Sequence, residues 1–411
     1  TQLLGWTTFL GPGLSQPAYL NNWTITNAAF NSATDGVNFV SIKVVSADGL
    51  SQYATDVFYI LKDTIAPPAP SVSGYEAGAK TVTLTDGGWY SFANPYFEWS
   101  AVTDLPSPLN SGAKDFLVYF GTDSAGVPDI ATTDLNFTST ATLVTGYTYY
   151  LRISSRDNLN NTGAATTVFT YKYDITAPNN PAVPVSGWSD SGKVTAITDA
   201  TAYNYEYPYF EWTAPDDLPA APANSGVGGY LVDFSTDPAY TPVSFQSAAS
   251  FQATATLCTD YYLRIRTSDN AFTPSTSTAV TAFHYVRIGN PSITDNQPGD
   301  DTWRAANSAT YDVDFVANCG LDLDYLQYSI WTAAGMGTGT GTELVSWTTF
   351  QGPGIGANSY TTDWPLLGAD FTGAADGINW ISVRAVDVNG QASIATDVFY
   401  VLKDTVPPDN P

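Results

Sequence analysis

The sequence has 411 residues and a mass of 43.8 kDa, so roughly 100–150 residues per domain predicts three or four domains. Its 14 Lys and Arg against 39 Asp and Glu give a net charge of -25, which excludes a basic surface for nucleic acid or for anionic membranes. The hydrophobic fraction of 44% is too high for a disordered chain. No apolar run approaches the ~20 residues that span a bilayer, so we expect no membrane insertion.

The composition predicts an all-β protein. Only five of the acidic residues are Glu and the other 34 are Asp, a residue that favours turns and caps over helix interiors. With 26 Pro and 33 Gly, this balance predicts short strands joined by turns. The sequence begins at Thr1 with neither an initiator Met nor a signal peptide, so we expect it to be part of a longer, extracellular microbial protein.

In chain order, the first predicted strands belong to a segment whose sequence is repeated at the end of the chain. Residues 5–70 align without a gap with residues 346–411, and 30 of these 66 positions are identical. The tetrapeptide Trp-Thr-Thr-Phe, for example, occurs at 6–9 and again at 347–350. A repeat of this length indicates a duplicated structural unit.

A second pair of repeats lies between them. Pro-Tyr-Phe-Glu-Trp occurs at 95–99 and at 208–212, and Tyr-Leu-Arg-Ile occurs at 150–153 and at 262–265. Apolar and polar residues alternate along these segments, which predicts half-buried strands with Leu151 facing the core. Units of ~110 residues with such strands are typical of immunoglobulin-like sandwiches.

Two resemblances to known families follow from these segments. The run Phe210-Glu211-Trp212-Thr213-Ala214-Pro215 and the later Tyr261–Arg266 resemble strands of a fibronectin type III module. The run Val383–Gly390 and the segment Phe399–Pro408 are similar to bacterial Ig-like repeats of secreted surface proteins. The resemblances imply tandem β-sandwiches and leave function open, because such modules serve as spacers, adhesins, fibres and enzyme appendages.

Pro-rich junctions divide the chain. We predict the C-terminal half of an Ig-like domain at 1–66, fibronectin III-like domains at 67–177 and 178–289, and a complete Ig-like domain with a C-terminal linker at 290–411. Short Pro-containing linkers restrict backbone freedom, which predicts a semi-rigid, extended row of domains.

The first unit lacks a counterpart of residues 290–345, so its apolar inner face needs a partner. Two explanations stay open: the chain is a slice of a longer tandem array, or a neighbouring subunit supplies the missing strands. In both, the partners are copies of this chain or adjacent repeats of the same polypeptide. The expected contact residues are aromatic: Trp6, Phe9, Trp23, Phe30 and Phe39.

Asp-rich turns beside the junctions are the best candidates for a ligand site. Carboxylate and carbonyl oxygens are the ligands of Ca²⁺, and the resemblance to bacterial Ig-like adhesins implies calcium at domain junctions. Two candidate sets follow, with Asp387, Asn389 and Asp404 in the last unit and Asp157, Asn158 and Asp174 in the second. The alternative is that these are ordinary turn residues.

Catalytic sites are not expected. His284, the sole histidine, aligns with Thr170 of the sister repeat, which predicts a place on a strand face. Glu98 and Glu211 occupy equivalent positions in separate repeats, so they cannot form the carboxylate pair of a glycosidase. Cys258 aligns with Val144, which predicts a buried residue unpaired with Cys319.

The sequence therefore predicts a non-catalytic subunit of an extracellular filament, stalk or surface fibre. Two alternatives remain: an adhesin or carbohydrate-binding array that recognises a surface glycan, and a non-catalytic appendage of a secreted hydrolase. Both use the same sandwich modules, so the sequence does not separate them.

Overall fold

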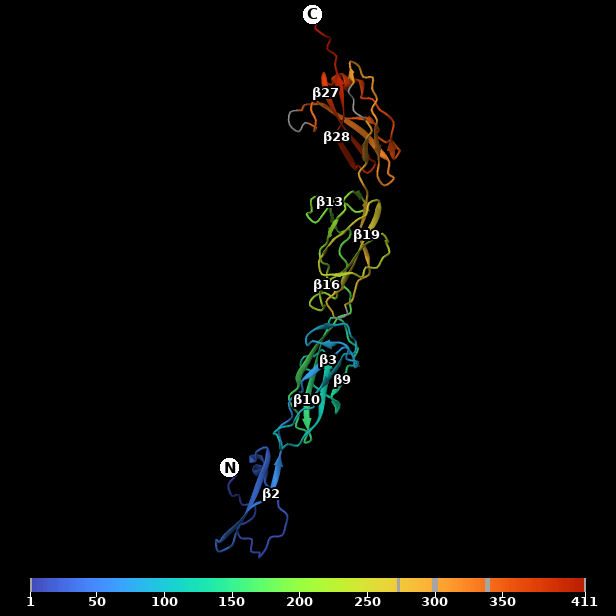
Figure 1. Ribbon diagram of the computed structural model, residues 1–411. Helices are drawn as coiled ribbons and strands as arrows, with labels where there is room; N and C mark the ends of the chain where they lie inside the picture. The colour runs from blue at the N-terminus through green and yellow to red at the C-terminus, as the bar shows by residue number, and fades with distance from the viewer. Residues whose placement is uncertain (1, 272–273, 298–301, 337–340, 410–411) are drawn as a thin grey trace. The chain divides into compact units, whose positions relative to one another are not determined.

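The computed structural model describes residues 2–271, 274–297, 302–336 and 341–409, and it is almost entirely β (Figure 1). The chain forms two compact units. The first contains residues 1–178 with the loops 216–226 and 269–275, and the second contains 179–215, 227–268 and 276–411. Among the described residues, no helix is long and apolar enough to cross a bilayer.

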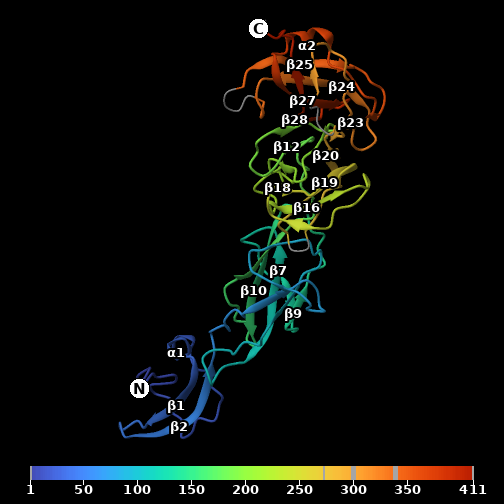
Figure 2. The ribbon, with the colours of Figure 1, turned by 45° about the horizontal axis from the view of Figure 1, so that its top comes forward.

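The first unit starts with an isolated hairpin. Strand β1 (Gly36–Val45) pairs antiparallel with β2 (Ser51–Lys62), and the short helix α1 (Asn27–Ser32) lies beside them (Figure 2). Thr26 caps the helix by accepting a hydrogen bond from the Ala29 amide. No second sheet faces this hairpin within residues 2–66, which is the arrangement expected of half a sandwich.

The rest of the first unit is a two-sheet sandwich. The order of one sheet is β4-β3-β6-β9, and that of the other is β5-β11-β10-β7-β8. The strands are β3 (Val72–Tyr75), β4 (Thr83–Leu84), β5 (Trp89–Tyr90), β6 (Tyr96–Trp99), β7 (Ala113–Gly121), β8 (Ile130–Thr132), β9 (Asn136–Thr138), β10 (Thr148–Asp157) and β11 (Thr166–Tyr173). Leu151 and Ile153 of β10 are fully buried in its core, as their alternation predicts.

The second unit holds two further sandwiches. In the first of them, the sheets are β13-β12-β15-β18 and β14-β20-β19-β16-β17. Its strands are β12 (Ser186–Trp188), β13 (Ala196–Ile197), β14 (Ala202–Tyr203), β15 (Tyr209–Glu211), β16 (Val227–Ser235), β17 (Phe245–Gln246), β18 (Ser250–Gln252), β19 (Thr259–Asp269) and β20 (Val280–Arg287). Phe210, Leu263 and Tyr285 are fully buried at its centre.

The last sandwich has the sheets β21-β23-β26 and β22-β28-β27-β24-β25. Its strands are β21 (Ser292–Asp295), β22 (Trp303–Arg304), β23 (Val313–Val316), β24 (Leu323–Trp331), β25 (Glu343–Gln351), β26 (Ser359–Tyr360), β27 (Gly377–Asp387) and β28 (Ala392–Lys403), and helix α2 is Gly368–Gly373. Strand β24 lies between β25 and β27 and pairs antiparallel with both, so without it β25 would have no partner in this sheet.

Hydrophobic cores therefore form in three of the four predicted domains. One lies within residues 67–177, one within 178–289 and one within 290–411, and residues 2–66 contribute to none of them. The chain is thus a series of β-sandwiches with half of a further one at its start. The residue boundaries given above stay predictions.

The prediction for the two cysteines was wrong. Cys258 is exposed in the turn before β19, and it forms a disulfide with Cys319, which lies in the loop between β23 and β24. The two Cα atoms are 5.0 Å apart, a normal spacing for a disulfide. The prediction failed because Val144, with which Cys258 aligns, is itself 51% exposed, and because Cys258 lies in an exposed turn with a left-handed backbone, with a φ of 58°.

Candidate functional site

Three aspartates meet inside the first unit and form what we call the first carboxylate cluster: Asp63, Asp104 and Asp157. Asp63 follows β2, Asp104 lies in the loop after β6, and Asp157 ends β10. One carboxylate oxygen of each lies within 4.8 Å of those of the other two. In the part of the chain that the structure describes, no other group of three His, Cys, Asp or Glu side chains brings one ligand atom of each within this distance. Asp104 and Asp157 are buried, and Asp63 is 9% exposed.

Backbone amides hold the carboxylates in place. The Ser111 amide donates to Asp63 Oδ2 at 2.6 Å, and the Gly112 amide donates to Asp104 Oδ2 at 2.8 Å. Asp157 Oδ1 accepts from the Asn161 amide at 2.7 Å. Burial by itself would raise the pKa of Asp63, but the hydrogen bonds from Ser111 outweigh it and the pKa is lowered. The Asp63 carboxylate is therefore stabilised in its ionised form.

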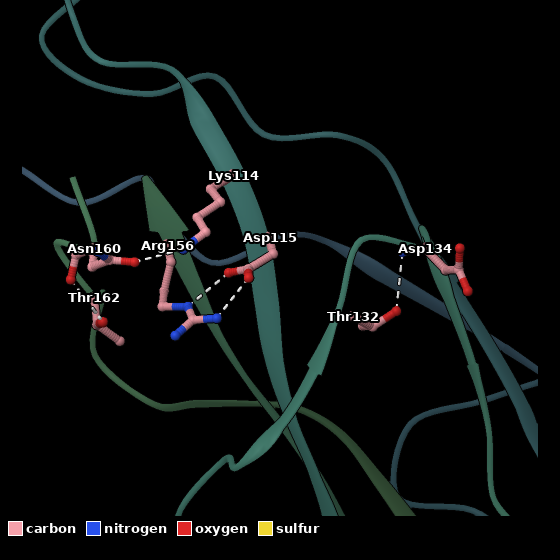
Figure 3. Close-up of polar contacts among 7 residues, drawn as sticks. All are labelled: Lys114, Asp115, Thr132, Asp134, Arg156, Asn160 and Thr162. Atoms are coloured by element: carbon pink, nitrogen blue, oxygen red, sulfur yellow. Dashed lines mark hydrogen bonds and ion pairs between the residues drawn. The ribbon is translucent and has the colours of Figure 1, made fainter. Parts of the chain in front are cut away.

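Among the described residues, no cationic side chain forms an ion pair with the first cluster. Arg156, next to Asp157 in the sequence, points to the other face of β10 and forms a bidentate ion pair with Asp115 of β7 (Figure 3). Lys114 instead donates to the amide oxygen of Asn160. The negative charges of the cluster are thus offset only by neutral N–H and O–H donors.

The second carboxylate cluster repeats this pattern one domain later, within the same unit: Asp174, Asp217 and Asp269. Asp174 follows β11 as Asp63 follows β2, and its Oδ2 accepts from the Ser225 amide at 2.8 Å. Asp217 Oδ1 accepts from the Leu218 amide, as Asp104 Oδ1 does from the Leu105 amide. Unlike those of the first cluster, the carboxylate oxygens of these three residues do not all lie within 4.8 Å of one another.

Burial and mutual repulsion act on this second cluster. Burial, with the charges of Asp174 and Asp217, raises the pKa of Asp269 to about 7, although amides donate to its carboxylate. Burial, followed by the charge of Asp174, also raises the pKa of Asp217. Asp217 is 6% exposed, and its Oδ2 accepts no hydrogen bond. A buried oxygen without a donor lacks compensation for its lost water.

The last sandwich keeps only one member of the pattern. Asp387 Oδ1 accepts from the Asn389 and Gln391 amides, as Asp157 does from Leu159 and Asn161. The residue that corresponds to Asp174 is Ile288, and the loop at 317–322 carries no carboxylate before Asp322. The Cys258–Cys319 disulfide lies in this loop instead.

The structure groups the sequence-predicted calcium residues differently. Asp157 and Asp174 lie at opposite ends of the β10–β11 pair, which places them roughly 30 Å apart at ~3.4 Å per residue. Asp387 and Asp404 are separated in the same way by the β27–β28 pair. Neither predicted set comes together, whereas Asp157 and Asp174 each join a different cluster.

The two asparagines have supporting positions. Asn158 donates from Nδ2 to the Ser111 carbonyl, next to the first cluster, and Asn389 donates its amide to Asp387. Sequence reasoning missed Asp104, Asp217 and Asp269 as members of these clusters. A signal was present, because Asp-Leu-Pro at 104–106 returns at 217–219 and Asp-Asn at 157–158 returns at 269–270.

The predicted contact aromatics lie on the first hairpin. The exposed fractions of Trp6, Phe9, Phe30 and Phe39 are 57%, 43%, 39% and 65%, and Trp23 is half-buried against Phe9, with ring centroids 4.2 Å apart. Phe9, Trp23 and Phe30 correspond to Phe350, Trp364 and Phe371, which belong to the core of the last sandwich or pack against it. Trp6 corresponds to Trp347, whose ring lies under the Arg384 guanidinium. Phe39 differs: it points to the opposite face, as does its half-buried counterpart Trp380.

Two shallow hollows mark the uncovered face of the hairpin. One, of about 650 Å³, is lined by residues around Ile42 and Tyr53, and the other, of about 540 Å³, lies between Trp23, Phe30 and Phe58. In the last sandwich, the space equivalent to the second hollow is filled by Tyr311 and Tyr328, which contact Trp364.

The residues considered for catalysis have structural surroundings. His284 lies on β20, as expected, and its ring stacks on that of Tyr262 with centroids 4.6 Å apart. Its Nε2 lies 3.6 Å from Asp260 Oδ2. Glu98 and Glu211 pair with Lys80 and Lys193 in two different sandwiches. Each glutamate thus belongs to a surface ion pair of its own repeat.

Comparisons with known proteins bear on the fold alone. No protein-family model and no curated protein matches the sequence. Three solved structures of similar tandem modules are the FN1–FN3 domains of chicken CNTN1, the fibronectin(III)-like modules of Clostridium thermocellum CbhA, and a tetra-tandem repeat in the extending region of a large adhesion protein.

Their identities to this chain are 11%, 13% and 15%, in the same order, and their TM-scores are 0.21, 0.26 and 0.24. The alignments cover 80%, 52% and 91% of this chain and 98%, 95% and 83% of the matched chains. At these values we base no functional conclusion on them. The sheets and cores described above show an array of tandem β-sandwiches of the Ig and fibronectin III kind.

Proposed function

We propose that this chain is a non-catalytic structural segment of an extracellular microbial filament, stalk or surface fibre, and that neighbouring polypeptide completes its N-terminal half domain. One observation carries the proposal. The tetrapeptide Trp-Thr-Thr-Phe is part of strand β25 at 347–350, but at 6–9 it forms no strand. The same residues therefore have a partner in one repeat and lack it in the other.

The missing partner corresponds to β24. In the last sandwich β24 pairs with β25 on one side and with β27 on the other. In the half domain, β1 is the counterpart of β27 and pairs with β2 on one edge, and no described strand pairs with its other edge. An unpaired edge beside an apolar face is a template for strand addition.

The complete repeat also gives the register of the added strand. Tyr328 lies opposite Val383, and Ile330 lies opposite Ile381. The counterparts of Val383 and Ile381 are Ile42 and Val40. A segment with the sequence pattern of Leu323–Trp331 would thus place an aromatic ring over the hollow beside Trp23.

The charge of the chain supports a specific contact of this kind. A net charge of -25 makes copies repel each other at low ionic strength. Association must then come from shape and apolar burial, and the uncovered face offers both. We propose copies of this chain, or adjacent repeats of the same polypeptide, as the partners.

The test uses the chain of residues 1–411 with a synthetic peptide of residues 321–333. Hydrogen exchange measured by mass spectrometry should show new protection at 5–10 and at 36–45 when the peptide is added. A matched peptide with Tyr328→Asp and Ile330→Asp is the control, because it keeps the length and removes the apolar face. Equal exchange with and without the unmodified peptide would refute strand completion.

Two further measurements address the scaffold itself. Electron microscopy of concentrated protein should show linear assemblies, and a glycan array with the folded chain should show no saturable binding. Saturable binding of one glycan class would instead favour an adhesin or a carbohydrate-recognising array.

A further inference from the structure

We propose that the two carboxylate clusters are Ca²⁺ sites, one at Asp63, Asp104 and Asp157 and the other at Asp174, Asp217 and Asp269. This inference goes beyond the proposed function and does not depend on strand completion. It rests on the spacing of the oxygens, on their charge, and on an internal comparison with the last sandwich.

The spacing of the first cluster suits calcium. Ca²⁺ binds oxygens at about 2.3–2.6 Å, so two of its ligands lie at most about 5 Å apart. The three carboxylates of the first cluster present oxygens within 4.8 Å of one another. Mg²⁺ prefers a tighter octahedron at about 2.0–2.1 Å and retains water, and zinc sites favour His and Cys, which neither cluster contains.

Carboxylate oxygens of the first cluster still have lone pairs for an ion. Asp63 Oδ2, Asp104 Oδ1 and Asp157 Oδ2 each accept one hydrogen bond and keep a second lone pair, and water would complete the coordination shell of Ca²⁺. The amides of Ser111, Gly112 and Asn161 then act as an outer support that fixes the ligands.

A second, independent observation comes from Asp217. Its side chain is more than nine-tenths buried, Oδ1 accepts from the Leu218 amide, and Oδ2 accepts no hydrogen bond. The corresponding Oδ2 of Asp104 belongs to the first cluster and accepts from Gly112. A buried carboxylate oxygen without a donor, close to the charges of two other carboxylates, requires a positive partner, and a divalent cation supplies it.

The last sandwich provides the internal comparison. Where the linker aspartate is replaced by Ile288, the one aspartate of the loop, Asp322, is exposed rather than buried, and the Cys258–Cys319 disulfide connects the turn before β19 to the loop after β23. The two changes occur together, as expected if a linker needs one device that fixes it. We infer that cations fix the linkers at Asp63 and Asp174 and that a covalent bond does so near Ile288.

The experiment measures calcium directly on the chain of residues 1–411. The protein is treated with EDTA, desalted, and titrated with CaCl₂ and separately with MgCl₂ by isothermal calorimetry, and bound metal is counted by mass spectrometry after dialysis. The expected result is two Ca²⁺ per chain, with an affinity at least tenfold above that for Mg²⁺.

Three variants assign the sites. Asp104→Asn and Asp217→Asn should each reduce the stoichiometry from two to one, and Asp387→Asn, a buried aspartate outside both clusters, should leave it at two. Near-ultraviolet circular dichroism checks that each variant is folded. If Asp104→Asn or Asp217→Asn unfolds the chain, the stoichiometry of the unmodified protein still tests whether the chain binds two Ca²⁺.

Two outcomes overturn the proposal. Fewer than one Ca²⁺ per chain at 5 mM calcium would exclude both sites. Two bound ions that persist in both Asp104→Asn and Asp217→Asn would place them elsewhere. A single ion that is lost only in Asp104→Asn would confirm the first site and refute the second.

Discussion

Replacing one phenylalanine in each of two equivalent strands tests whether the half domain lacks a closed core. Phe399 of β28 is 3% exposed, stacks on Tyr311 with centroids 4.2 Å apart, and meets Trp364 at 5.9 Å. Its counterpart, Phe58 of β2, is 37% exposed and has Trp23 at 6.0 Å. The sequences around the two are nearly identical, so the difference measures the missing sheet.

The expected costs follow from these surroundings. Phe399→Ala removes an enclosed ring and leaves a cavity, which costs about 3–5 kcal/mol in the free energy of unfolding of the last sandwich. At Phe58 more than a third of the ring is already in water, and no facing sheet closes a cavity. The loss from Phe58→Ala is then about 0.6 of the ~1.5–3 kcal/mol for burying a Phe, or about 1–2 kcal/mol.

Native-state hydrogen exchange, resolved by peptide, gives the opening free energy of β27–β28 and of β1–β2 separately. The reasoning fails if Phe58→Ala destabilises its hairpin as much as Phe399→Ala destabilises the last sandwich, because Phe58 would then already be in a closed core. With the peptide of residues 321–333 present, the cost at Phe58 should rise toward that at Phe399. An unchanged cost would show that the peptide does not cover this face.

Three further predictions concern single contacts. Burial raises the pKa of Asp387, so the folded state holds its proton more tightly than the unfolded state, and stability should fall as the pH rises from about 4 through that raised pKa. Asp387→Asn should remove this slope in melting curves taken in EDTA, and parallel curves would contradict it. Gly74→Ala should cost about 1–3 kcal/mol in thermal unfolding, because its Cβ would lie 2.9 Å from the Phe169 ring, and an unchanged melting temperature would show that the ring moves freely. Reduction of the Cys258–Cys319 disulfide, which spans 61 residues, should lower stability by up to about 4 kcal/mol, and Cys319→Ser should reproduce the loss without reductant.

The fold could be predicted from the sequence because its signals are local or repeated. Alternation along β10 indicated that Leu151 is buried, and it is. The gapless repeat of residues 5–70 at 346–411 indicated which part of the first unit is missing. Both inferences need only strand periodicity and self-comparison, which do not depend on how distant loops meet.

The candidate site could be predicted only in part, because its members come from three separate loops. Asp157 and Asp174 are 17 residues apart in the sequence, but an antiparallel pair of long strands carries them to opposite ends of one sandwich. Asp157 instead meets Asp63, which is 94 residues away and enters from the preceding linker. Sequence proximity therefore identified two of the clustered aspartates, Asp157 and Asp174, but grouped them together, whereas each lies in a different cluster.

The disulfide escaped prediction for a related reason. Cys258 aligns with Val144, and Val144 is itself 51% exposed, so the alignment does not indicate that Cys258 is buried. A turn residue with a positive φ points away from the strands that flank it. Contacts made by such turns depend on the neighbouring loop, which the repeat does not encode.

The proposed Ca²⁺ clusters and the Cys258–Cys319 disulfide should respond differently to a chelator and to a reductant. A carboxylate cluster without its cation combines burial with mutual repulsion, so removal of calcium should loosen the chain at Asp63 and Asp174. The disulfide near Ile288 is unaffected by a chelator and is broken by a reductant. EDTA and a reductant should therefore increase hydrogen exchange at different linkers, and a chelator that loosens all three equally would contradict the assignment of separate devices.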